Sequence, residues 1–99
     1  MTKPVRLSEA AEFDLGAIGD WIAKDSPSRA YTFTLELLKV CTELGYFPER
    51  FPRVPRYQSI RKRTYGNYVI FYKVAADQIE IIHIYHGSMD FDAMDLGES

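Results

Sequence analysis

Two groups of side chains in the C-terminal half of the sequence could take part in chemistry. Arg61 and Arg63 belong to a run of consecutive cations, and Tyr85 and His86 end an apolar stretch. RNA cleavage needs a base for the 2′-hydroxyl proton, an acid for the leaving oxygen and a cation for the phosphorane. In a ribonuclease, either arginine would supply the cation and Tyr85 or His86 would carry the proton.

Each group also has an interpretation without catalysis. On a strand, Arg61 and Arg63 share one face and Lys62 takes the other, so the run could form a contact surface for an acidic partner. It could equally be a charged strand that resists aggregation. His83 lies mid-strand beside isoleucines, which favours a hydrogen-bonded core histidine. We therefore expect binding rather than catalysis.

The sequence predicts neither a metal site nor a cofactor. It has one cysteine and two histidines. On a strand, the spacing of His83 and His86 places them on opposite faces, so they cannot share a metal without distant carboxylates.

The charges are unevenly distributed. The net charge is −2, which argues against a general nucleic-acid binder and against direct sequence-specific recognition of nucleic acid. However, half of the twelve basic residues lie between positions 50 and 63, where there is no Asp or Glu. The last eleven residues contain four acids and no base. We expect one positive face and a negative tail.

The first half of the chain predicts a short strand followed by two helices. Residues 4–7 fit a strand. Ser8 is a suitable N-cap for an amphipathic helix ending near Asp25, and Ser26-Pro27 is a second helix start. Gly45 is placed to end the second helix in the left-handed conformation. The short connection makes the two helices antiparallel neighbours.

The second half predicts a three-stranded antiparallel meander. Three prolines indicate irregular surface chain over residues 47–57. A basic strand begins near Ser59, Gly66-Asn67 supplies a two-residue turn, and residues 75–77 make the next reversal. The central strand, residues 68–74, is apolar on both faces and should be covered on both. In the last strand, Ile82 and Ile84 are expected to oppose Ile79 and Ile81.

These elements make a single α+β domain spanning residues 1–99, in which residues 88–99 are a tail that could order on a partner. Cys41 lies in an apolar helical stripe, so we expect its side chain to be buried. We also expect the protein to reside in a reducing compartment. The sequence shows neither a signal peptide nor a membrane-spanning run, so we expect a cytoplasmic protein without membrane contact.

The order of these elements, with several short sequence patterns, resembles the RelE/ParE superfamily of bacterial toxins from type II toxin–antitoxin systems. The closing His86-Gly87 and the central strand favour its ParE branch, although the ParE-like ending usually continues with Arg-Asp and this chain has Ser88-Met89-Asp90. The residues that carry the resemblance are 11–18, 26–30, 60–61, 68–72 and 82–87.

The resemblance implies a growth-inhibiting toxin that binds DNA gyrase and traps its cleavage complex, neutralised by a cognate antitoxin. A ribosome-dependent mRNA endonuclease and a non-toxic antitoxin-binding module are the alternatives. The expected target-binding residues are Arg56, Arg61, Lys62, Arg63, Tyr85, His86 and Met89. The expected antitoxin-binding residues are Trp21, Phe33, Leu37, Arg61 and Tyr72.

Overall fold

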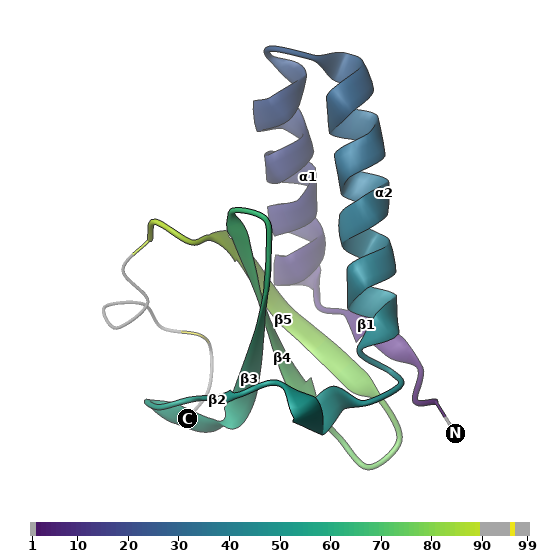
Figure 1. Cartoon of the computed structure of the whole chain (residues 1–99), viewed down its shortest axis with the longest axis vertical. Coiled ribbons are helices and arrows are strands. Elements are labelled where there is room, and N and C mark those ends of the chain that lie inside the picture. Colours follow the sequence, from purple (N-terminus) through teal and green to yellow (C-terminus); the bar gives the residue numbers. More distant parts are fainter. Residues whose placement is uncertain (1, 90–95, 97–99) are drawn as a thin grey trace.

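A helical hairpin packs on one face of a five-stranded sheet, which confirms the predicted α+β class. The computed structural model describes residues 2–89 and 96. In Figure 1 the tip of the hairpin extends beyond the sheet. The elements in chain order are β1 (Val5–Leu7), α1 (Glu9–Ala23), α2 (Pro27–Glu43), the 3₁₀ helix η1 (Pro48–Arg50), β2 (Arg53–Val54), β3 (Tyr57–Tyr65), β4 (Tyr68–Val74) and β5 (Ile79–His86).

The strand order in the sheet is β1-β5-β4-β3-β2. The pairs β2·β3, β3·β4 and β4·β5 are antiparallel, so the predicted meander is present, and β1 pairs with β5 in parallel. The strand β2 was not predicted. Neither the length nor the hydropathy that a membrane-spanning helix requires is reached by any helix in the part of the chain that the structure describes.

Both helices begin where their capping residues predict. The Ser8 hydroxyl accepts a hydrogen bond from the Ala11 N–H at 3.0 Å, and the Ser26 hydroxyl accepts one from the Arg29 N–H at 3.2 Å. These bonds satisfy N–H groups that have no partner within the helix. The buried helical residues are Ala11, Ile18, Ala30, Phe33, Leu37, Val40 and Cys41.

The prediction for Gly45 is wrong. Gly66, with φ of 58°, is the one glycine with positive φ in the described part of the chain. Leu44 caps α2 in the right-handed conformation, and the Gly45 carbonyl accepts a hydrogen bond from the Lys3 N–H at 2.9 Å. A Cβ at position 45 would lie 2.3 Å from the Lys3 carbonyl oxygen. Glycine is therefore needed because the N-terminal segment passes close to it.

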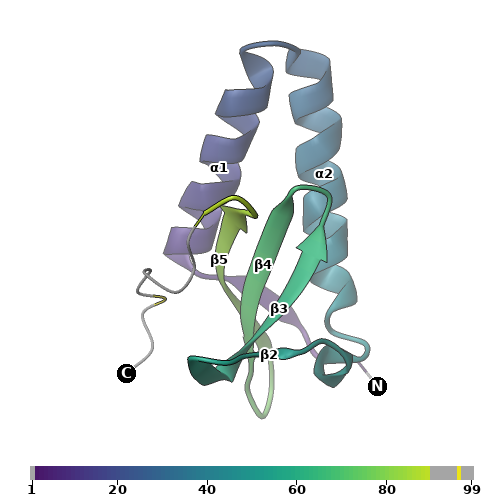
Figure 2. The same cartoon turned by 60° about the vertical axis from the view of Figure 1, so that its left-hand side comes forward.

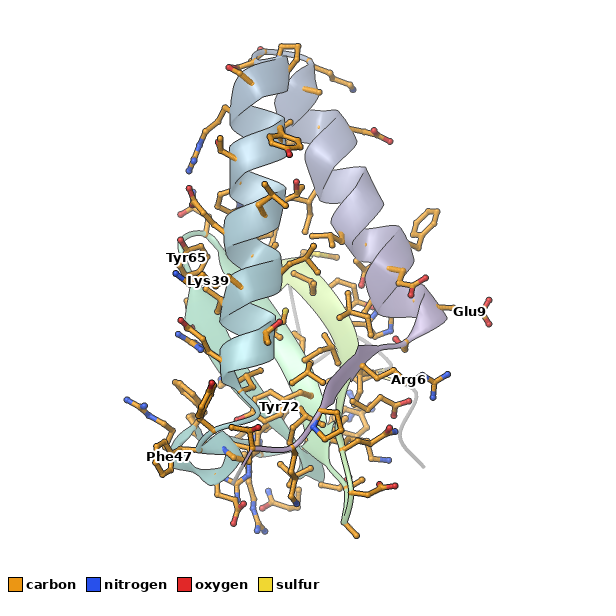
Figure 3. All side chains as sticks on the ribbon, turned by 90° about the vertical axis from the view of Figure 1, so that its right-hand side faces the viewer. Arg6, Glu9, Lys39, Phe47, Tyr65 and Tyr72 are labelled. Carbon is orange, nitrogen blue, oxygen red and sulfur yellow. The ribbon has the colours of Figure 1, made fainter. Side chains whose placement is uncertain are left out.

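The segment before β3 is more ordered than predicted. It contains η1 and β2, and Pro48 is buried instead of lying on the surface. The Pro48 carbonyl accepts a hydrogen bond from the hydroxyl of Tyr72, a fully buried residue of β4. Figure 3 shows Tyr72 on the inner side of this segment and Phe47 pointing outward. Tertiary contact with the sheet orders this proline-rich stretch.

The predicted faces of β5 are correct as far as Ile82, which lies opposite Ile79 and Ile81, but wrong for Ile84, because this strand contains an irregularity. Phe71 is paired with His83 but Tyr72 with Ile81, so Ile82 is an extra residue between them. Such a bulge reverses the alternation of side chains. Consequently, Ile84 joins Ile79 and Ile81 in the core under the helices, and Ile82 packs on the opposite face.

The sheet has a core on each face. Ile70 and Tyr72 contribute to the larger core under the helices, whereas Val69 and Phe71 face the smaller one. This confirms that β4 is covered on both sides. Figure 2 shows the helices behind β3, β4 and β5. Leu96, only 1% exposed, packs in the smaller core, while the rest of the predicted tail from 90 to 99 lies outside the described residues.

Candidate functional site

Helix α1 closes the part of the β5 edge that β1 leaves open. The pairing with β1 ends at Ile81. Ser8 continues the edge contacts, because its N–H donates to the Ile81 carbonyl at 2.9 Å and its hydroxyl donates to the Ile82 carbonyl at 2.9 Å. Farther along, Asp14 Oδ2 accepts the Ile84 N–H at 3.0 Å. The helix thus fixes the end of β5 that carries the candidate site residues.

His83 is hydrogen-bonded, as the sequence predicted, but it is half-buried and does not belong to either core. Its Nδ1 lies 2.9 Å from Asp14 Oδ2, and its ring stacks on Tyr85 with centroids 4.6 Å apart. The role of Asp14 was not predicted. In the sequence it is one of several acids on the polar side of α1, and nothing local distinguishes it.

A short turn orients His86. Its Nδ1 accepts a hydrogen bond from the Ser88 N–H at 3.1 Å and lies 2.7 Å from the Ser88 hydroxyl. Its ring meets Tyr68 edge-on at 5.3 Å. The Met89 N–H donates to the His86 carbonyl, and the Met89 side chain is exposed. Ser88 therefore holds His86 in place.

A hollow of about 510 Å³ lies between α1 and the end of β5. It brings Trp21, which was predicted to bind the antitoxin, together with three residues that were predicted to bind the target: Tyr85, His86 and Met89. A second hollow continues from Trp21 and His86 toward Arg29 and Phe33. We call these two hollows the helix–sheet groove. The residues that define it here are Asp14, Trp21, Arg29, Phe33, Tyr68, Tyr85, His86 and Met89.

The two predicted arginines of β3 are engaged in structural contacts. Arg61 Nη1 donates to the Glu49 and Phe51 carbonyls at 3.1 and 2.7 Å. Arg63 Nη1 donates to the Val40 carbonyl at 3.1 Å, near the C-terminus of α2, where a cation is favourable. Arg63 Nη2 also pairs with Glu43 at 3.3 Å.

The four residues of the ribonuclease interpretation are not brought together. Arg63 pairs with Ile70, which faces the helices, whereas Tyr85 pairs with Val69, which faces the other way. Because β4 separates β3 from β5, the strands that carry them are about 10 Å apart. His86 lies at the end of β5, and Arg61 is directed toward the loop at Phe51.

The remaining predicted contact residues differ in exposure. Trp21 is 67% exposed, and Phe33 is mostly buried beneath Arg29, whose guanidinium lies 5.0 Å from its ring. Leu37 and Tyr72 are fully buried, so in this structure they support the groove from below and offer no side-chain surface to a partner. Arg56 is exposed and lies 5.4 Å from the Tyr57 ring, and Lys62 is half-buried.

Burial raises two pKa values under the helices. The pKa of the Cys41 thiol rises to about 12 through burial, although nearby Arg63 opposes the shift. Burial also raises the pKa of Tyr72 to about 12, opposed mainly by Arg61. Both groups are therefore protonated at neutral pH. Among the described residues, no group of three His, Cys, Asp or Glu side chains could hold a metal ion.

A family model described as the ParE toxin of the type II toxin–antitoxin system, parDE, matches residues 5–91. The chain belongs to the ParE toxin family. The expected relationship to the RelE/ParE superfamily is thereby confirmed. A search of curated proteins found no match.

Two solved structures share the fold of this ParE-family chain. One is described as the chromosomal ParDE TA system from P. aeruginosa, with a TM-score of 0.76 and 18% identity over 86% of this chain and 96% of that one. The other is the toxin–antitoxin complex RelBE2 from Mycobacterium tuberculosis, with a TM-score of 0.68 and 18% identity over 87% of this chain and 99% of that one. At 18% identity, these two similarities show a shared fold alone.

Proposed function

We propose that this chain is the toxin of a type II toxin–antitoxin system and that it inhibits growth by binding DNA gyrase and trapping its cleavage complex. The observation that carries the proposal is the match of the ParE toxin family to residues 5–91. The separation of Arg61 and Arg63 from Tyr85 favours binding over catalysis. The groove end formed by Tyr85, His86 and Met89 is the proposed gyrase contact, and the exposed Arg56 adds positive charge.

The proposed antitoxin is a co-encoded protein whose disordered tail orders in the helix–sheet groove. The two solved structures named above are described as a TA system and a toxin–antitoxin complex. An apolar anchor of the tail would pack against exposed Trp21, and an acid would meet Arg29, which lies over Phe33. Trp21 and His86 line the same groove, so the antitoxin and gyrase would compete for it.

The proposal is tested by gyrase supercoiling of plasmid DNA with the purified chain. We expect inhibition by the wild type and at least about tenfold weaker inhibition by Met89→Asp, because a buried unpaired charge opposes binding at a contact. Phe13→Ala is the matched control, because Phe13 is 77% exposed on α1 and is not among the residues that line either hollow. Full supercoiling at a stoichiometric excess of folded protein contradicts the proposal.

An mRNA endonuclease is the second candidate, because the resemblance to the RelE/ParE superfamily also implies it. In that case Tyr85→Phe and His86→Ala would abolish toxicity while leaving folding and ribosome binding unchanged. A contact role predicts instead a graded loss of affinity for the target. Measuring ribosome binding and mRNA cleavage with both variants separates the two mechanisms.

A further inference from the structure

Three arginines gather around Phe51, and a fourth, Arg53, follows it in the neighbouring strand β2. The guanidinium carbons of Arg50 and Arg63 lie 5.3 and 5.0 Å from the centre of the Phe51 ring. Arg61 donates a hydrogen bond to the Phe51 carbonyl at 2.7 Å. Arg53 lies directly opposite Arg61 across the β2–β3 pair. Like charges opposite each other destabilise a sheet, so this arrangement has a cost in the free protein.

Carboxylates compensate this charge only in part. Glu43 pairs with Arg63 at 3.3 Å and is the one acid that forms an ion pair with these four arginines among the described residues. Glu49 contributes its backbone carbonyl to Arg61. Arg50 and Arg53 are exposed. The cluster therefore retains positive charge that is available to an anion.

Two exposed aromatic rings adjoin the cluster. Tyr46 and Phe47 are 62% and 69% exposed, and both line a hollow of about 500 Å³ with Arg50, Phe51 and Arg63. Figure 3 shows the Phe47 side chain pointing away from the body of the protein. Exposed rings beside guanidinium groups are the combination on which unpaired bases stack while their phosphates meet cations. An acidic protein segment would use the arginines but would gain less from two solvent-facing rings.

We propose that the arginine–aromatic surface formed by Tyr46, Phe47, Arg50 and Phe51, together with Arg53 on the adjoining strand β2, binds single-stranded DNA without sequence preference. Bases stack on Tyr46 and Phe47, and phosphodiesters contact Arg50 and Arg53. The choice of DNA over RNA rests on the proposed action at gyrase, an enzyme that holds cleaved DNA. The net charge of −2 keeps the isolated interaction weak and dependent on low salt.

The test is fluorescence anisotropy of a labelled twelve-nucleotide dT strand titrated with the full chain at several salt concentrations, without gyrase. We expect saturable binding that weakens with salt. Removing both rings in Tyr46→Ala/Phe47→Ala should weaken binding at least about fivefold. Arg50→Ala and Arg53→Ala should each reduce the slope of log affinity against log salt by about one. Phe13→Ala and Lys39→Ala remove an exposed ring and an exposed cation elsewhere and should leave binding unchanged.

Three results would overturn the inference: no saturable binding at low salt, equal losses in the control variants, or tighter binding of rU than of dT strands. Equal affinity for duplex DNA, with no effect of the ring substitutions, would also contradict it, since stacking needs unpaired bases. Phe47→Leu, which keeps an apolar side chain without the ring, should weaken binding even if the double variant unfolds. Because gyrase is absent from this assay, DNA binding without gyrase inhibition would overturn the proposed function and leave this inference standing.

Discussion

Asp14 and His83, which are 69 residues apart in sequence, are joined by a hydrogen bond of 2.9 Å between Oδ2 and Nδ1. The same carboxylate oxygen accepts the Ile84 N–H. One side chain of α1 therefore positions both the ring and the backbone at the end of β5. The helix–sheet groove depends on this connection, because Asp14 and Ile84 both line it.

Replacing Asp14 should destabilise the domain. Asp14→Ala leaves two donors without their acceptor, and we expect a loss of about 1–3 kcal/mol in the free energy of unfolding. Asp14→Asn keeps an acceptor oxygen and should lose less. Asp20→Ala, an exposed acid on the same helix, is the control and should stay within about 0.5 kcal/mol of wild type in urea denaturation. Equal effects of Asp14→Ala and Asp20→Ala would contradict the assignment.

Alanine should have opposite effects at two glycines. At Gly45 the added Cβ would meet the Lys3 carbonyl oxygen, and we expect a loss of about 1–3 kcal/mol. At Gly16, in the exposed middle of α1, the Cβ would have nothing within 4 Å, and the gain should be about 0.5–1 kcal/mol. Thermal melts of the two variants provide the comparison. A stable Gly45→Ala protein would mean that the N-terminal segment does not pass this close.

Stability should fall at alkaline pH. The pKa values of Cys41 and Tyr72 are about 12 in the folded chain, above the ordinary values of about 8.5 and 10 for exposed groups. Above pH about 8.5 the unfolded chain thus binds fewer protons, so the free energy of unfolding decreases as pH rises toward 12. Cys41→Ala should be less stable at neutral pH but should show a shallower decline between pH about 8.5 and 10. Parallel curves for the two proteins in this window would rule out the contribution of Cys41.

Arg63 should matter for stability as well as for any partner. Arg63→Ala removes the hydrogen bond to the Val40 carbonyl and the pair with Glu43, and we expect a loss of about 1–3 kcal/mol. Lys39→Ala, which removes an exposed cation, should change stability by less than about 0.5 kcal/mol. Urea denaturation distinguishes them. If Arg63→Ala is as stable as Lys39→Ala, the observed contacts contribute little and its charge is free for binding.

Trp21 should contribute to antitoxin binding without contributing to folding. It is 67% exposed yet lines both hollows of the helix–sheet groove. We expect Trp21→Ala to weaken antitoxin binding about 10- to 100-fold by calorimetry while leaving the melting temperature nearly unchanged. Phe13→Ala, with a similarly exposed ring outside the groove, should retain wild-type affinity. A reversed ranking of these two variants would place the antitoxin elsewhere.

Local signals predicted every helix and strand except η1 and β2, but they did not predict the contacts between them. The capping roles of Ser8 and Ser26 and the turn role of Gly66 involve neighbouring backbone, so they can be read from the sequence. The bonds of Ser8 to Ile81 and Ile82 cannot. The bulge at Ile82 could not be predicted, because β5 carries isoleucines on both faces. The alternation of apolar and polar residues therefore does not show where the side chains change face. The role of Gly45 was predicted wrongly because Lys3, which approaches it closely, is far from it in the sequence.

The same distinction applies to the candidate site. The sequence predicted the ends of the meander as the places of function, and the structure places Tyr85, His86 and Met89 in one groove with Trp21. The sequence could not predict that Arg61 donates to carbonyl groups of the segment before β2, or that Arg63 donates to a carbonyl group of α2. The Arg61 contacts depend on the path of the segment containing η1 and β2, and the Arg63 contacts depend on the position of α2 over the sheet. Both arrangements form only when the domain is folded.

The most direct measurement of the proposed action is the amount of DNA that gyrase leaves cleaved. Gyrase and plasmid are incubated with increasing amounts of the chain, and detergent and protease are then added to release the covalently held ends. If the chain traps the cleavage complex, linear DNA should increase with its concentration and disappear when the cognate antitoxin is added first. If folded chain in stoichiometric excess yields no linear DNA and supercoiling continues, the account of this protein as a gyrase poison is contradicted.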